Sequence, residues 1–221
     1  MKRTLFGAMV VLCVAAWAEA ARIDTGATPK GLDELVEAGG AFKTALVRPG
    51  VDFSTYVNLY PRTVKLVVDA PGVTGEAAPG SLIGKRKGSG NLPGRPDVQL
   101  LQQILDETVA TEAKASSDRR VVLDPGPDTI ALRVTVTDLD FGKAKIDGEP
   151  VPTVKRGIIV FDLVDSTTGI IQARFAERRK CPQGASGDPT DAVGGRWPGV
   201  SAWLKEAMVD LFNELDWATA G

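Results

Sequence analysis

The sequence predicts an α+β fold, with a mixed or mostly antiparallel sheet of about five to six strands and two long helices packed on one face. Three observations lead to this prediction. Two stretches, residues 97–115 and 200–217, have apolar side chains at helical spacing. Several strand-like segments joined by short turns lie between them. Helices separated by consecutive strands are typical of α+β domains, in which the helices share one face of the sheet.

The first part of the predicted domain contributes two strands. Residues 42–47 are mostly apolar and end at Pro49 and Gly50, whereas residues 64–69 alternate between apolar and polar side chains. A period of two predicts a strand with one buried face. Residues 52–60, between these segments, have neither the helical nor the strand period, and we expect them to be irregular.

Four more strands are predicted between the two helices, over residues 120–123, 129–139, 158–164 and 170–176. The second alternates regularly, and the third is apolar on nearly both faces, which predicts a central strand. The turn-forming residues 165–169 join the last two strands as an antiparallel hairpin.

Each predicted helix has one continuous apolar stripe. The first helix follows Pro96, a residue suited to the first turn because its missing N–H would have no partner there. The stripe of the second helix consists of Val200, Trp203, Leu204, Ala207, Met208, Leu211, Phe212 and Leu215.

The first twenty residues have the three parts of a secretory signal peptide. Lys2 and Arg3 form a basic start, residues 5–16 form an apolar run too short to span a bilayer, and residues 18–20 form a small-x-small cleavage site. We therefore expect export across the inner membrane, cleavage near Ala21 and residence in the periplasm.

We expect the chain to divide into a signal peptide (1–20), a flexible N-terminal segment (21–41) and a single α+β domain (42–221). No apolar run after the signal peptide is long enough to form a transmembrane helix. Lipid attachment at Cys13 is disfavoured because the large Leu12 precedes it. A peripheral association with the outer membrane stays open.

The composition excludes several classes of chemistry. The chain contains no histidine, so it has no Ser-His-Asp or Cys-His arrangement and no imidazole metal ligand. Only Cys181 remains after signal cleavage, which excludes an intramolecular disulfide and a structural zinc site. A formal net charge of −2 argues against nucleic-acid binding, which requires a strongly basic face. We expect no cofactor.

Two groups of acidic residues are candidates for a catalytic or metal site. Asp138 and Asp140 have a spacing that can hold a divalent cation, but aspartate is also common at strand ends, and we favour that interpretation. Asp162, Asp165 and Glu177 lie on a predicted hairpin and are candidates for the paired carboxylates of a glycoside hydrolase. Asp165 is more simply a hydrogen-bond acceptor of the turn. We assign no catalytic or metal-binding residue.

Basic and aromatic residues give the candidate contact surface. One basic run lies within the glycine- and proline-rich loop 70–96, and another lies at the end of a predicted strand. Such runs either contact an anionic surface or are simply solvated. Tryptophan is enriched at interfaces, and two tryptophans near the C-terminus are expected to be partly exposed. The candidate residues are Lys85, Arg86, Lys87, Arg178, Arg179, Lys180, Trp197 and Trp217.

Four stretches carry a resemblance to a known family: residues 46–56 (LVRPGVDFSTY), 62–71 (RTVKLVVDAP), 123–141 (LDPGPDTIALRVTVTDLDF) and 159–179 (IVFDLVDSTTGIIQARFAERR). The chain resembles an uncharacterised family of bacterial envelope proteins, a domain of unknown function whose members are often lipid-anchored. The resemblance covers most of the mature chain. It implies residence in the envelope and assigns no chemistry.

Together, these observations predict a non-catalytic, exported envelope binding or accessory protein. Its expected partner is an envelope protein or an anionic envelope component, bound by loop 70–96, the strand end at 178–180 or an uncovered sheet face. The alternative is a carboxylate-dependent cell-wall or glycan hydrolase.

Overall fold

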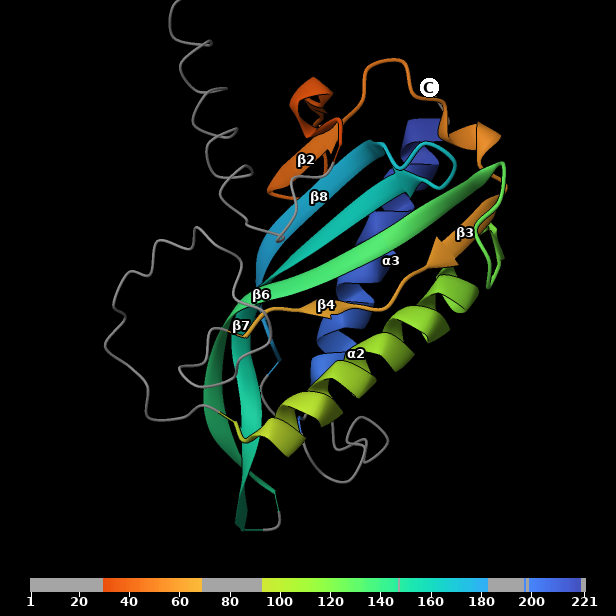
Figure 1. The fold of residues 1–221 in the computed structure, drawn as a ribbon. Coiled ribbons are helices and arrows are strands. Elements are labelled where there is room, and N and C mark those ends of the chain that lie inside the picture. Colours follow the sequence, from red (N-terminus) through yellow and green to blue (C-terminus); the bar gives the residue numbers. More distant parts are fainter. Residues whose placement is uncertain (1–29, 69–92, 147, 183–196, 198, 220–221) are drawn as a thin grey trace, which may run out of the picture.

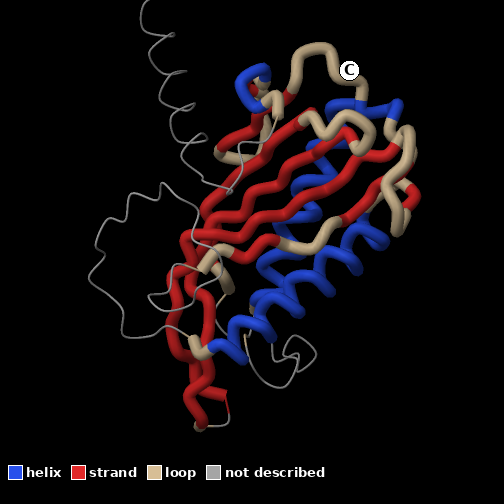
Figure 2. The backbone as a smooth tube through the Cα atoms, viewed as in Figure 1, coloured by secondary structure: helices blue, strands red, loops and turns tan. Residues whose placement is uncertain are grey.

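The structure is a computed structural model that describes residues 30–68, 93–146, 148–182, 197 and 199–219. Within these ranges, an eight-stranded mixed sheet has two long helices on one of its faces (Figures 1 and 2). The predicted α+β class is confirmed. The predicted number of five to six strands is wrong, because two short strands, at residues 36–37 and 58–61, have no recognisable sequence pattern, and the second begins within the segment 52–60 that was expected to be irregular.

Seven of the eight strands follow the order β1-β2-β8-β7-β6-β3-β5 across the sheet, and the eighth, β4, pairs with β6 outside this path. Pairing is antiparallel from β1 to β6, whereas β3 and β4 run parallel to β6, and β5 runs parallel to β3. The strands are β1 (Val36–Glu37), β2 (Thr44–Val47), β3 (Asn58–Pro61), β4 (Lys65–Leu66), β5 (Arg120–Val121), β6 (Thr129–Ile146), β7 (Glu149–Asp165) and β8 (Ile171–Lys180).

The two long helices agree closely with the prediction. Helix α2 (Arg95–Ser116) has its proline in the first turn, and α3 (Val200–Thr219) is the last element of the chain. Two short 3-10 turns, η1 (Leu32–Glu34) and η2 (Phe53–Thr55), complete the described elements. No helix in the described ranges is long and apolar enough to cross a membrane.

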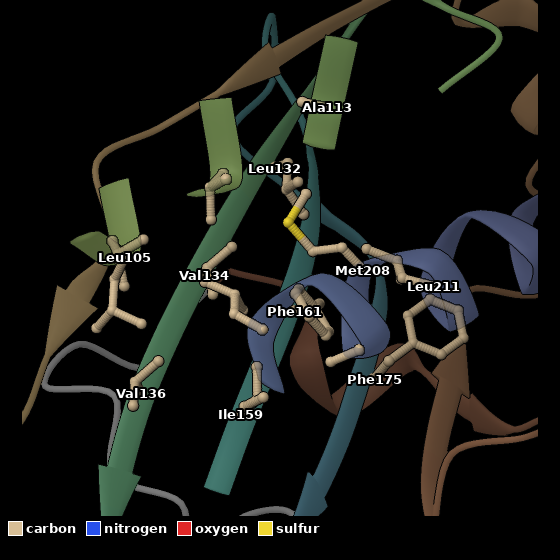
Figure 3. Packing of buried hydrophobic residues seen from close by; sticks show 14 of the residues in the cluster. Leu105, Ala113, Leu132, Val134, Val136, Ile159, Phe161, Phe175, Met208 and Leu211 are labelled. Atoms are coloured by element: carbon tan, nitrogen blue, oxygen red, sulfur yellow. The ribbon is translucent and has the colours of Figure 1, made fainter. Parts of the chain in front are cut away.

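The main hydrophobic core lies between the two helices and the sheet (Figure 3). Alternate residues of the central strands point toward the helices and are almost completely buried, as the strand period requires. Met208 and Leu211 of α3 and Phe161 of β7 belong to this core. The strand residues of this layer include Leu132, Val134, Val136, Ile159, Phe161, Leu163, Ala173 and Phe175.

The hairpin of β6 and β7 is longer than predicted and extends past the rest of the sheet as a two-stranded arm (Figure 1). Pro150 and Pro152 interrupt the strand pattern in the sequence. They are accommodated because β8 pairs with β7 only from Arg156 onward, so this part of β7 is an edge that requires no N–H donor.

The N-terminal segment also contributes to the sheet. β1 pairs with β2, and Leu35 is completely buried. Leu35 belongs to a second, smaller cluster with Leu46, Ala131, Val164 and Ile171. The sequence predicted a flexible segment over residues 21–41; within it, Leu35 is buried, and the exposed Val36 and Glu37 pair with β2.

We expect Phe161→Ala to lower the free energy of unfolding by about 3–5 kcal/mol, because it removes a large, fully buried ring from the layer between the sheet and α3. Urea denaturation measures this change. Leu123→Ala is the matched control: Leu123 is 86% exposed, so a change of no more than about 0.5 kcal/mol is expected. Equal losses in both variants would contradict the assigned core.

Candidate functional site

A row of charged residues crosses the sheet on the face opposite the long helices. Arg133 of β6 is paired in register with Asp162 of β7, and Asp162 is paired with Arg174 of β8. Side chains alternate between the faces of a strand. Because the neighbours Leu132 and Phe161 point into the main core, the three charged side chains point to the other face.

The pair at one end of this charged row is buried and geometrically complete. Arg174 donates from Nε to Oδ1 of Asp162 at 2.6 Å and from Nη2 to Oδ2 at 3.0 Å. Arg174 is 1% exposed and Asp162 is 3% exposed. Burial of two charges is tolerable when both oxygens of the carboxylate are held by two parallel N–H donors.

At the other end of the row, the guanidinium of Arg133 does not have its N–H donors paired in this way. Its Nη2 lies 3.6 Å from Oδ2 of Asp162, which makes an ion pair beyond hydrogen-bonding distance. The Nε and Nη2 atoms are buried and have no hydrogen-bond acceptor in the described part of the chain. Burial lowers the pKa of Arg133, the attraction of Asp162 opposes this effect, and the positive charges of Arg62 and Arg174 add to it.

Arg62 provides a further cation beside Arg133. It follows β3, and its backbone N–H donates to the carbonyl oxygen of Leu132 at 2.9 Å, so it lies next to Arg133 across the strand pair. Its side chain is exposed. Arg133 and Arg174 flank one carboxylate and Arg62 lies beside Arg133, so the described charged residues of this part of the sheet carry an excess of positive charge.

The three candidate acids for hydrolysis do not converge. Asp162 lies on the face opposite the helices, whereas Glu177 is paired in register with Ile159, a residue of the main core, and so points to the helix side. Glu177 accepts a hydrogen bond from Nε of Arg179 at 2.6 Å. The interpretation that these acids share one site on the hairpin is therefore wrong, because the strand register places them on opposite faces.

Asp165 acts as the acceptor of the turn, as the simpler interpretation predicted. Its Oδ1 accepts from the N–H groups of Thr167 at 3.0 Å and Thr168 at 2.7 Å, and its Oδ2 accepts from the hydroxyl of Tyr56 at 2.9 Å. Burial acts to raise the pKa of Asp165, but the hydrogen bonds from Thr168, Tyr56 and Thr167 outweigh it and lower the pKa.

The aspartates at the end of the regular part of β6 form ion pairs. Asp138 pairs with Arg178, and Asp140 lies 3.2 Å from Nε of Arg156. The strand is irregular here, and Asp138 has a left-handed backbone with a φ of 49°. Among the described residues there is no group of three or more potential metal ligands.

The basic run at the end of β8 is largely engaged within the protein. Arg178 binds Asp138. Arg179 bridges Glu177 and, at 2.5 Å, Asp210 of α3, and its guanidinium lies 5.6 Å from the centre of the Phe42 ring. Lys180 is exposed. The other predicted run, Lys85, Arg86 and Lys87, lies outside the described residues.

Of the two candidate tryptophans, the structure describes the side chain of Trp197 but not that of Trp217. Trp197 is completely buried, so the prediction that it is partly exposed is wrong. Its indole N–H donates to the carbonyl oxygen of Asp97 at 2.8 Å, and its ring packs 5.8 Å from that of Phe141. Trp217 lies in α3, and its side chain is outside the described part of the structure.

Cys181 is a free, buried cysteine. Burial, aided by the negative charge of Glu206, raises the pKa of its thiol to about 12. The reactive thiolate form is therefore scarce at neutral pH.

Sequence reasoning missed Arg133 and Arg174 as site residues. A signal for both was present, because each is a charged residue within a segment that otherwise has the composition of a buried strand. Charged residues are rarely buried unless they are paired, so such positions indicate either a partner across the sheet or a ligand.

No protein-family model matches the chain, and no curated protein matches it. The chain is similar to a PelC dodecamer from Paraburkholderia phytofirmans (12% identity, 82% of this chain and 95% of that chain, TM-score 0.40). It is also similar to a DUF330 protein from Xanthomonas campestris (14% identity, 84% of this chain and 90% of that chain, TM-score 0.31). A third similar structure is a minor lipoprotein from Acinetobacter baumannii (12% identity, 75% of this chain and 92% of that chain, TM-score 0.23).

All three TM-scores lie below 0.5, so these likenesses transfer neither a function nor an assembly to this chain.

Asp162→Asn should lower the free energy of unfolding by about 3–5 kcal/mol, because it leaves the buried Arg174 without its neutralising partner. Chemical denaturation at neutral pH measures the loss. Asp140→Asn is the control, because it removes the same charge from an exposed ion pair and should cost about 1 kcal/mol or less. Similar losses of unfolding free energy in both variants would show that burial of the Asp162–Arg174 pair does not determine its contribution to stability.

The alkaline pH dependence of stability should depend on Tyr56. Burial, together with its hydrogen bond to Asp165, raises the pKa of Tyr56 to about 12, above the usual tyrosine value of about 10. The folded state favours the neutral phenol, so this stabilisation is complete below pH ~10 and is lost as the pH rises toward 12.

The chain has two tyrosines, so absorbance titration of Tyr60→Phe reports on Tyr56 alone. We expect a step near pH 12 in this variant, and Tyr56→Phe should remove the corresponding loss of stability. A step near pH 10 from Tyr56 in the folded protein would contradict the assigned hydrogen bond.

Proposed function

We propose that this protein is a non-catalytic accessory protein of the cell envelope that acts by binding a partner beside Arg133, which is partly exposed, whereas Asp162 and Arg174 are buried. The observation that supports this proposal is the charged row itself. It combines a buried, self-sufficient ion pair with a second arginine whose buried donors have no acceptor among the described residues. The exposed Arg62 beside Arg133 provides a cation that a partner can reach from solvent.

The surroundings of the acidic residues favour binding over hydrolysis. A glycosidase requires two carboxyl groups facing one substrate, at about 5–9.5 Å from each other. Here Asp162 and Glu177 point to opposite faces of the sheet, and an arginine holds each of them. Asp165 has a lowered pKa, which is unsuited to a general acid.

The proposed compartment is the periplasm, with peripheral association with the outer membrane as an alternative. It is supported by the signal-peptide pattern of residues 1–20 and by the resemblance to envelope proteins. The partner is an envelope protein or an anionic envelope component, since the proposed contact face has an excess of arginine.

A photo-crosslinking residue placed at Thr137 should give a reproducible adduct in intact cells, because Thr137 is partly exposed on the same strand face as Arg133. The same residue at Asn213, which is exposed on α3, is the matched control and should give none. Fractionation should place the processed protein in the envelope.

Three results would contradict the proposal. The first is an unprocessed chain found in the cytosol, and the second is equal crosslinking from Thr137 and Asn213. The third is hydrolysis of wall or glycan substrates by the purified protein that disappears in a folded Glu177→Gln variant.

A further inference from the structure

Residues 30–38 lie at the edge of the sheet beside β2 and form a strap with few buried contacts (Figure 1). The strap contains η1 and the two-residue strand β1, which is the last strand at this end of the sheet. Leu35 is its one buried residue, whereas both residues of β1 are exposed. Segments with few buried apolar contacts open more readily than the core of a protein. We therefore expect the strap to open while the rest of the fold stays intact.

The surface under the strap is separate from the main core. The buried residues that pack with Leu35 are Leu46, Ala131, Val164 and Ile171. This cluster lies on the sheet face opposite the helices, because Leu46 is paired in register with Arg174. Removal of Leu35 from the cluster would therefore leave the core on the helix side complete.

Arg48 binds the strap to the sheet. Its Nη2 donates to the carbonyl oxygen of Gly31 at 3.1 Å, and its Nη1 forms an ion pair with Glu34. Its Nε and Nη2 also donate to the carbonyl oxygen of Ile171, each at 3.2 Å. The N–H of Ile171 in turn donates to the carbonyl oxygen of Lys30 at 3.1 Å. Since Arg48 has an acceptor on β8 as well as on the strap, its guanidinium would keep a partner after the strap opens.

A glycine at the end of the strap provides a hinge. Gly39 is exposed, and a Cβ at this position would meet no atom within 4 Å. Its backbone can therefore rotate without a clash, and glycine has the widest range of backbone angles. The chain after the hinge is attached to the core, because the N–H of Ala41 donates to the carboxylate of Glu214 on α3. Rotation at Gly39 would move the strap and leave β2 in place.

We propose that residues 30–38 are a releasable strap, which occupies a binding site for an extended segment of a partner protein. Opening at Gly39 would uncover the apolar cluster around Leu46 and the backbone edge of β2. A free sheet edge binds an extended peptide through main-chain hydrogen bonds, and apolar contacts select its side chains. The strap itself indicates the chemistry that fits, namely a short strand that places one leucine in the cluster. This inference goes beyond the proposed function, because the site does not include Arg133.

Hydrogen exchange of the purified full-length protein tests the opening step. The N–H groups of Ala38 and Ile171 donate at the two ends of the strap, to the carbonyl oxygens of Ala45 and Lys30. Both amides should exchange at least about 100-fold faster than the amides of the central strand β7, because they open without global unfolding. Exchange of the two amides at the same rate as β7 would overturn the inference.

Gly31→Ala should open the strap selectively. Gly31 has a φ of 82°, which a residue with a Cβ rarely adopts, and the added Cβ would lie 2.9 Å from the side chain of Ile170. We expect exchange of the two strap amides to rise at least about tenfold, with exchange in β7 unchanged. Arg48→Gln removes the side-chain contacts to the strap and should act in the same direction.

Gly148→Ala is the matched control for Gly31→Ala. Gly148 has a φ of 86° in the turn of the β6–β7 arm, and a Cβ there would meet no atom within 4 Å. It carries the same backbone strain without touching the strap, so the strap amides should be unaffected. Equal effects of Gly148→Ala and Gly31→Ala would overturn the inference. Global unfolding of Gly31→Ala, or no effect of either Gly31→Ala or Arg48→Gln, would also overturn it.

A labelled peptide with the sequence of residues 30–38 tests whether the site accepts a segment from outside. It should bind the full-length Gly31→Ala variant at least about tenfold more tightly than the wild-type protein, whose own strap fills the site. A peptide with aspartate in place of Leu35 is the matched control and should not bind. Equal binding of the two peptides, or no binding of either, would overturn the inference. Equal crosslinking from Thr137 and Asn213 would contradict the proposed function alone.

Discussion

The register of the central strand β7 is the constraint on which the rest of the structure depends. Phe161 must face the helices, and the adjacent Asp162 must meet Arg174 on the other face. A shift of one residue would exchange the faces of all the side chains and bring a carboxylate into the apolar core. The hydrophobic pattern and the buried ion pair therefore specify the same pairing. Since β6 and β8 both pair with β7, this register also determines where Arg133 and Arg174 stand.

The elements that could be predicted are those whose signal is local. The stripes of α2 and α3 repeat over several turns, and residues 129–136 alternate without interruption, so each pattern is visible in a short window. Strands β1 and β3, which were not predicted, have two and four residues and gain their structure from pairing with neighbouring strands. No window of the sequence contains that information. Likewise, Pro150 and Pro152 have the character of strand breakers until the topology shows that they lie on an edge.

The charged row could not be predicted because it is assembled from three strands. Sequence spacing alone allowed Asp162 and Glu177 to converge, but their positions in the register place them on opposite faces. Arg179 has the sequence context of a solvated basic run, yet its partner Asp210 comes from α3, thirty-one residues away. Trp197 is buried instead of lying at an interface because its indole N–H finds a backbone carbonyl at the start of α2, and a tryptophan with a partner for its N–H can be buried.

The charged row contains one more positive charge than its buried ion pair needs, and this charge belongs to Arg133. A buried ion pair adds little to stability compared with apolar residues of similar volume, and the pair of Asp162 with Arg174 is balanced without any further charge. Arg133 adds a cation whose desolvated donors have no acceptor in the described structure, which costs free energy in the unliganded protein. Folding does not require such a residue, since an apolar side chain at this position would satisfy the strand pattern.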